Sequence, residues 1–119
     1  MSTFAITNPR TEATLASRAR LANNFFSRFR GLMWTDSLPE GEALLIVPCN
    51  SVHCFGMRYA IDVAFLAKDG TVLHLIPDMA PGKLSPLVKG ARATLELPAG
   101  TLARTETQVG DKLEMPAIP

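Results

Sequence analysis

The stretch that decides the fold runs from residue 61 to residue 76 and reads IDVAFLAKDGTVLHLI. Its two apolar halves are rich in the β-branched and aromatic residues that strands favour. Between them lies Lys68-Asp69-Gly70-Thr71, and glycine adopts the positive φ that tight hairpin turns require. The sequence therefore predicts a β-hairpin with strands over residues 61–67 and 72–76.

Short segments of the same kind continue on both sides of this hairpin, and glycine and proline separate them. Residues 13–22 and 91–97 alternate between apolar and polar side chains, which is typical of half-buried strands. Further strands are predicted over residues 43–47, 51–59 and 112–115. Many short strands separated by turn residues favour an all-β sandwich or barrel.

One segment departs from this pattern. After a possible N-cap at Asn23-Asn24, apolar residues follow at helical spacing: Phe25, Phe26, Phe29, Leu32 and Met33. Residues 25–33 are predicted to form a short amphipathic helix, and residues 100–106 one helical turn. The predicted fold class is mainly β: a compact antiparallel β-barrel or sandwich with one short amphipathic helix.

Length and composition limit the classes of function. The chain has 119 residues, 47% of them hydrophobic, which fits one domain over residues 1–119 with a sizeable core. The net charge is +1, and the arginines before residue 31 lack the lysine runs of a nucleic-acid footprint, so no nucleic-acid partner is predicted. No apolar run approaches the roughly 20 residues of a membrane span, so no membrane partner is predicted. No signal peptide is visible, which predicts a cytoplasmic location.

Asp62 is the least expected residue of the predicted strands. Ile61, Val63 and Phe65 should face one side of the sheet, and Asp62 faces the other side with further apolar residues. A buried carboxylate needs cationic or hydrogen-bonding partners. The sequence predicts an ion pair with Arg28 first and Arg58 second, which would fix the structure, and leaves a functional role for Asp62 open.

His53 opens a second candidate group. On a regular strand His53, Phe55, Met57 and Tyr59 would share one face. A histidine beside such a stripe can be a general base, a ligand contact, a metal ligand or an ordinary core residue. The candidate ligand-binding residues are Arg28, His53, Met57, Tyr59 and Asp62, and the candidate catalytic residues are His53 and Asp62.

Other chemistries have weaker signals. Cys49, His53 and Cys54 match no zinc spacing, and no second pair of ligands follows, so no metal and no cofactor are predicted. Asp62 and Glu96 could form an acid pair for glycoside hydrolysis only if both carboxyl groups flank one bond.

Four sequence blocks, taken together, resemble one family. They are Arg28-Phe29-Arg30-Gly31-Leu32-Met33, the segment from His53 to Phe65, Leu95-Glu96-Leu97-Pro98-Ala99-Gly100, and Val109-Gly110-Asp111. In this order they resemble domain-of-unknown-function family 192, over residues 11–115. The resemblance implies a compact, mostly antiparallel β-domain with one short helix and implies no activity. Many members have tryptophan where this chain has Gly56.

Two functions follow as hypotheses. The first is a non-enzymatic binding module for a small molecule or a protein, with the candidate residues lining a pocket. The alternative is a small hydrolase or lyase that uses His53 as the base, oriented by Asp62, with an arginine binding an anion. The first is preferred, because the sequence contains no visible pairing of a nucleophile with a base.

Overall fold

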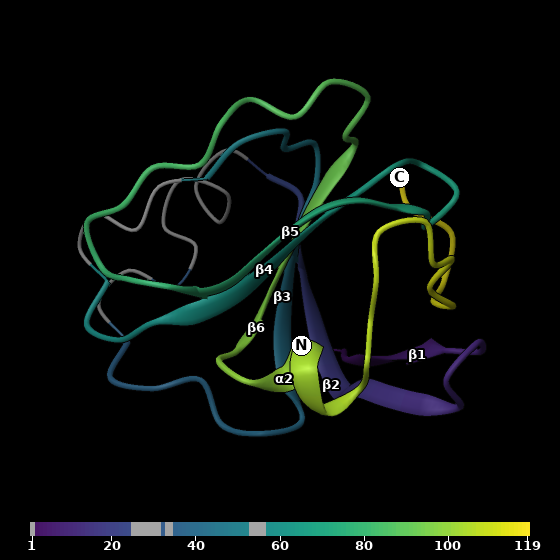
Figure 1. Ribbon diagram of the computed structural model, residues 1–119, viewed down its shortest axis with the longest axis horizontal. Coiled ribbons are helices and arrows are strands. Elements are labelled where there is room, and N and C mark those ends of the chain that lie inside the picture. The colour runs from purple at the N-terminus through teal and green to yellow at the C-terminus, as the bar shows by residue number, and fades with distance from the viewer. Residues whose placement is uncertain (1, 25–31, 33–34, 53–56) are drawn as a thin grey trace.

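A computed structural model describes residues 2–24, 32, 35–52 and 57–119 of the protein (Figure 1). The elements in this part of the chain are β1 (Phe4–Asn8), β2 (Ala13–Ala22), β3 (Glu42–Ile46), β4 (Ile61–Leu66), β5 (Val72–Met79), β6 (Ala93–Pro98) and the short helix α2 (Thr101–Arg104). The prediction of a mainly β fold is confirmed. No helix among these residues is long and apolar enough to cross a membrane.

The six strands form one sheet in the order β1-β2-β3-β6-β4-β5. All neighbouring strands pair antiparallel except β2 and β3, which run parallel. A parallel pair needs a long crossover, and residues 23–41 connect these two strands. The sheet is therefore mixed rather than purely antiparallel, and β6 lies at its centre between β3 and β4.

The predicted hairpin of β4 and β5 is confirmed, including its turn. Gly70 has a φ of 93°, and a Cβ atom at this position would lie 2.6 Å from the carbonyl oxygen of Leu113. Only glycine fits both the conformation and the close approach. The strand β5 continues past the predicted end at residue 76 and reaches Met79.

The sheet is open, and its edge strands are β1 and β5. The C-terminal segment links the two edges through isolated bridges, Thr7 with Glu114 and Thr71 with Lys112 (Figure 1). The strand predicted over residues 112–115 thus forms bridges only. Closure into a barrel by strand pairing, one of the predicted forms, is not observed.

A buried polar cluster fixes this C-terminal segment to β1. Asp111 accepts hydrogen bonds from Nε of Arg10 at 2.6 Å and from Nδ2 of Asn8 at 2.9 Å. The hydrogen bond from Arg10 is the main cause that lowers the pKa of Asp111 to about 2. No strand is predicted over residues 4–8 from the sequence; these five residues become β1 through pairing with β2 and a bridge to the C-terminal segment.

The sheet has two apolar faces, each with its own core. The tail face packs against α2 and the C-terminal segment, and its buried residues include Leu45, Leu66, Leu95, Leu97, Leu102, Leu113 and Ile118. The loop face packs against the long connections, and its buried residues include Leu32, Leu38, Leu44, Ile46, Ile61, Val63 and Phe65. In Figure 1 the loops gather on one side of the sheet, and the C-terminal segment lies on the other.

Two predicted elements lie on the loop face. The strand predicted over residues 51–59 is not formed by Ser51, Val52 or residues 57–59, which are irregular. Val52 instead exchanges hydrogen bonds with Ser85, at 2.8 Å in each direction, so a loop takes the place of a neighbouring strand. Of the helix predicted over residues 25–33, only Leu32 is described, and it is buried.

Candidate functional site

Asp62 is buried on the tail face and accepts three backbone hydrogen bonds. The N–H of Asp78 donates to Oδ1 at 2.8 Å. The N–H groups of Gly100 and Leu102 donate to Oδ2 at 3.1 and 2.8 Å. Asp62 therefore joins β4 to β5 and to the beginning of α2, and its carboxylate has a structural role.

Local backbone geometry brings these donors to Asp62. Ile61 pairs with Met79 and Val63 with Ile76, so two residues of β5 stand opposite Asp62 in a β-bulge. Asp78, one of these two, has a φ of 52°, and Gly100 has a φ of 94°. Both conformations accompany amide groups directed at the carboxylate.

The predicted ion pair of Asp62 with Arg58 is wrong. Arg58 pairs with Asp36 at the surface, where both side chains are exposed. No arginine bonds to Asp62 among residues 2–24, 32, 35–52 and 57–119, and Arg28 lies outside the described residues. The prediction failed because backbone amides, which no side-chain pattern displays, supply the partners instead.

A second carboxyl group is buried on the loop face. Glu96 lies in the central strand β6, paired with Val63 on one side and Leu44 on the other, and is 3% exposed. Its Oε1 has no hydrogen-bond partner within the described part of the chain. Burial raises the pKa of Glu96 to about 7. This carboxyl group can therefore be neutral near neutral pH and can serve as hydrogen-bond donor or acceptor.

Polar groups from the covering loops lie near Glu96. The hydroxyl of Tyr59 is 2.7 Å from Oγ1 of Thr35, and that Oγ1 in turn donates to the carbonyl of Leu32 at 2.6 Å. Because the single hydroxyl proton of Thr35 is used on Leu32, Tyr59 must be the donor in the first bond. Burial is the main cause that raises the pKa of Tyr59, and the charge of Glu96 raises it further.

Three more side chains complete this candidate site. Arg20 in β2 pairs with Leu44, whose other neighbour is Glu96, so Arg20 and Glu96 stand on the same face in one cross-strand row. Arg20 is partly buried and lowers the pKa of Tyr59. Met57 packs against the loop-face core, and the ring of His74 lies 6.0 Å from that of Phe65. These side chains form a small set of polar groups within an apolar setting.

The acid pair considered from the sequence is excluded by the register of β4 and β6. Asp62 stands opposite Leu97 and Glu96 stands opposite Val63, so the two acids point to opposite faces of the sheet. They cannot flank one glycosidic bond, as that chemistry requires.

The structure brings together only part of the predicted site. Met57 and Tyr59 lie on the loop face, and Asp62 does not. Arg28 and His53 lie outside the described residues. The sequence predicts a role for Glu96 only as half of an acid pair. The signal that identifies it is an acid in the alternating strand 91–97, which is buried because β6 is central in the sheet.

Metal binding has no support in the described residues. Residues 2–24, 32, 35–52 and 57–119 contain no group of three or more histidine, cysteine, aspartate or glutamate side chains that could hold a metal ion. The thiol of Cys49 donates to the carbonyl of Ser51 at 3.0 Å, an ordinary local contact.

The family model and the curated relatives that match this chain name no activity. The profile of the DUF192 family, described as an uncharacterised family, matches residues 6–115. A UPF0127 protein of Pyrococcus furiosus is 34% identical over 100 residues, which cover 80% of this chain and 84% of the relative. A UPF0127 protein of Thermococcus sibiricus is 31% identical over 102 residues, which cover 82% of this chain and 65% of the relative, just under two thirds of that protein's length.

The fold also has a solved counterpart. The crystal structure of a candidate transcription regulator from Sinorhizobium meliloti matches with a TM-score of 0.82 and 22% identity, covering 97% of this chain and 96% of that one. At this level of identity the likeness shows the fold alone.

Proposed function

Because the chain belongs to the DUF192 family, whose matching relatives carry no named activity, we propose a function from the loop face itself. The protein is a binding module for a small molecule that donates a hydrogen bond to Glu96. One observation carries this proposal: Oε1 of Glu96 is buried without a hydrogen-bond partner within the described part of the chain.

The energetic argument favours a ligand as the missing partner. A buried polar atom without a hydrogen bond costs about 1–3 kcal/mol, and proteins keep few of them. An amine or hydroxyl group of a ligand would satisfy Oε1, and the partly buried side chains of Met57 and Ile76 on the same face would contact an apolar body. The ligand class is therefore a small molecule with a hydrogen-bond donor and an apolar portion.

The other residues that the sequence suggests for ligand binding are not equally supported. Met57 and Tyr59 belong to the loop face, and Arg28 and His53, expected from the sequence, stay proposals because they lie outside the described residues. Asp62 is proposed to hold the fold rather than the ligand, since its carboxylate already accepts three backbone hydrogen bonds. The cytoplasmic location also stays a proposal.

A panel of small amines and alcohols tests the binding function by thermal unfolding. A ligand present at a hundred times its Kd should stabilise the wild-type protein by about 2.7 kcal/mol. Glu96→Leu, which removes the acceptor, should abolish most of this stabilisation, and Glu114→Leu, at an exposed position, should leave it unchanged. Equal stabilisation of wild type and Glu96→Leu by every binding compound would contradict the role of Glu96.

The catalytic alternative has one supporting observation. A buried carboxyl group whose pKa is about 7 is suited to general acid or base catalysis at neutral pH. In that case Glu96, rather than Asp62, would be the carboxyl group that takes part in catalysis, and the role of His53 stays a proposal from the sequence. Chemical conversion of a bound compound, followed by NMR over hours, would favour the enzyme, and unchanged recovery would favour the binding module.

A further inference from the structure

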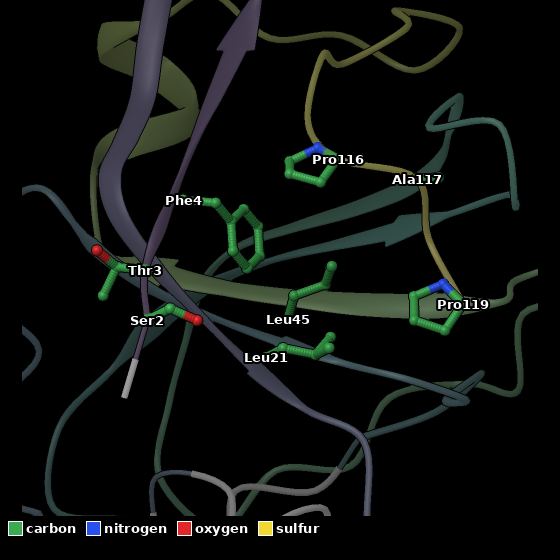
Figure 2. Close-up of a pocket in the computed structure, with 8 residues that line it drawn as sticks. All are labelled: Ser2, Thr3, Phe4, Leu21, Leu45, Pro116, Ala117 and Pro119. Carbon is green, nitrogen blue, oxygen red and sulfur yellow. The ribbon is translucent and has the colours of Figure 1, made fainter.

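A separate pocket lies on the tail face, away from Glu96 (Figure 2). Phe4, Leu21 and Leu45 from three neighbouring strands form its floor, and Pro116, Ala117 and Pro119 from the C-terminal segment form its wall. In Figure 2 the ring of Phe4 and the side chains of Leu45 and Leu21 lie together, facing the two prolines.

The walls of this pocket are fixed before any ligand arrives. Leu45 is 2% exposed and belongs to the core, and Ile118 anchors the C-terminal segment in the same core. Nε of Arg92 donates to the carbonyl oxygen of Pro119 at 2.8 Å. The prolines add stiffness, because their rings restrict φ. A pocket with fixed walls loses little conformational entropy when it binds.

The chemistry of the lining limits what the pocket can hold. None of the side chains of the described residues that line it is charged, so a charged ligand would lose hydration without gaining an ion pair from these side chains. The side-chain oxygen of Ser2 points toward the leucines in Figure 2 and gives one end a polar group. The volume of about 330 Å³ lies at the lower end of the range for small-molecule sites.

We propose that this pocket binds a neutral small molecule with an aliphatic body and one hydroxyl or comparable polar end. The aliphatic body contacts Phe4, Leu21 and Leu45, and the polar end lies near Ser2. A protein partner is less suited, because a stable interface buries about 800 Å² on each side, far more than a single pocket of this volume offers. The site is on the opposite face of the sheet from Glu96, so it does not depend on the proposed function.

Titration with 1-hexanol, followed by two-dimensional amide NMR, tests the proposal. Saturable shifts should centre on Phe4, Leu21, Leu45 and Ala117. Hexanoate and hexylamine, which have similar bodies and a charge, should bind at least about tenfold more weakly, the equivalent of about 1.4 kcal/mol. Shifts centred elsewhere, or equally tight binding of a charged probe, would overturn the proposed ligand class.

A pair of variants locates the site. Ala117→Trp should fill the pocket from its exposed wall and weaken hexanol binding at least about tenfold, through lost apolar contact. Ala103→Trp, at an exposed position of α2 outside the pocket, should bind hexanol as the wild type does. Unchanged binding by Ala117→Trp would overturn the proposal. So would a dimer of the wild type, measured by sedimentation, that Ala117→Trp alone abolishes, because the pocket would then be a contact between copies of the chain.

Discussion

Two buried acids on neighbouring strands differ in their hydrogen-bond partners. Asp62 in β4 and Glu96 in β6 are 1% and 3% exposed, and their strands pair directly. Asp62 accepts three backbone hydrogen bonds on the tail face. Glu96 has an oxygen without a partner in the described residues on the loop face. Burial alone therefore does not show what an acid does, and its hydrogen-bond partners have to be counted.

The two faces of the sheet differ in how many hydrogen-bond donors they supply to the buried acid. On the tail face the main chain closes around Asp62, since a β-bulge and the start of α2 supply every donor. On the loop face the covering segments contribute side chains such as Tyr59 and Thr35 and leave Glu96 available. An acid saturated by the backbone stabilises the fold, whereas an unsatisfied one is a candidate for binding.

The largest effect is expected for Asp62→Ala. The substitution leaves the amides of Asp78, Gly100 and Leu102 without their acceptor, and that of Leu102 is fully buried. The free energy of unfolding should fall by about 3–5 kcal/mol, measured by guanidinium chloride denaturation at pH 7. Asp69→Ala removes an aspartate that accepts a hydrogen bond from Thr71 in an exposed turn, and its effect should be far smaller. If both variants lose a similar free energy of unfolding, the buried Asp62 is no more important for stability than the exposed turn residue Asp69.

Glu96→Gln should have a smaller effect, in the opposite direction and dependent on pH. Its folded pKa is about 7 against an ordinary value of 4.5, so the native state keeps its proton after the unfolded chain has lost it. Stability linked to Glu96 is thus fully present below pH 4.5 and is lost as the pH rises to about 7. The variant should match the wild type at pH 4 and exceed its stability by roughly 3 kcal/mol at pH 8.

Urea denaturation at pH 4, 6 and 8 measures this difference, with Glu114→Gln as the exposed control. If the gap between wild type and Glu96→Gln stays constant with pH, the acid is not buried in the way described. A variant of Glu96 that is more stable than the wild type but no longer binds the ligand would show that this acid lowers the stability of the protein and is needed for binding.

The sequence predicted those parts of the fold that depend on local pattern. The turn at Asp69-Gly70 and the strand over residues 13–22 have local causes, and both are confirmed by the structure, although burial along β2 does not alternate strictly. The parallel pairing of β2 with β3 and the strand β1 depend on contacts between distant segments, so no local pattern displays them. For the site, the apolar run around Asp62 correctly indicated a buried acid.

The partners of the acids were harder to foresee. Asp62 is bonded by amides whose direction depends on the bulge at Asp78 and on the positive φ of Gly100. Such geometry has no signature in residue type at these positions beyond the glycine. Glu96 occupied the polar half of an alternating strand, and only the position of β6 between β3 and β4 shows that both faces are covered.

The smallest predicted effect concerns Tyr59, which tests how firmly side chains alone hold the loop face. Its hydroxyl donates to Thr35, and Thr35 donates onward to the carbonyl of Leu32, so a short chain of hydrogen bonds connects Tyr59 to the β2–β3 connection. Tyr59→Phe should lower the free energy of unfolding by about 1 kcal/mol, the ordinary net value of one hydrogen bond.

A double-mutant cycle with Thr35→Val separates this bond from the other contacts of the two residues. Thr35→Val should cost more than Tyr59→Phe, because it also removes the bond to Leu32. The two losses should not add, and the difference, about 1 kcal/mol, is the energy of the shared bond. Fully additive losses would mean that Tyr59 holds its place by packing alone. Apolar packing alone would then hold the covering segments on the loop face. The loop face would differ even more from the tail face, where hydrogen bonds to Asp62 hold the segments together.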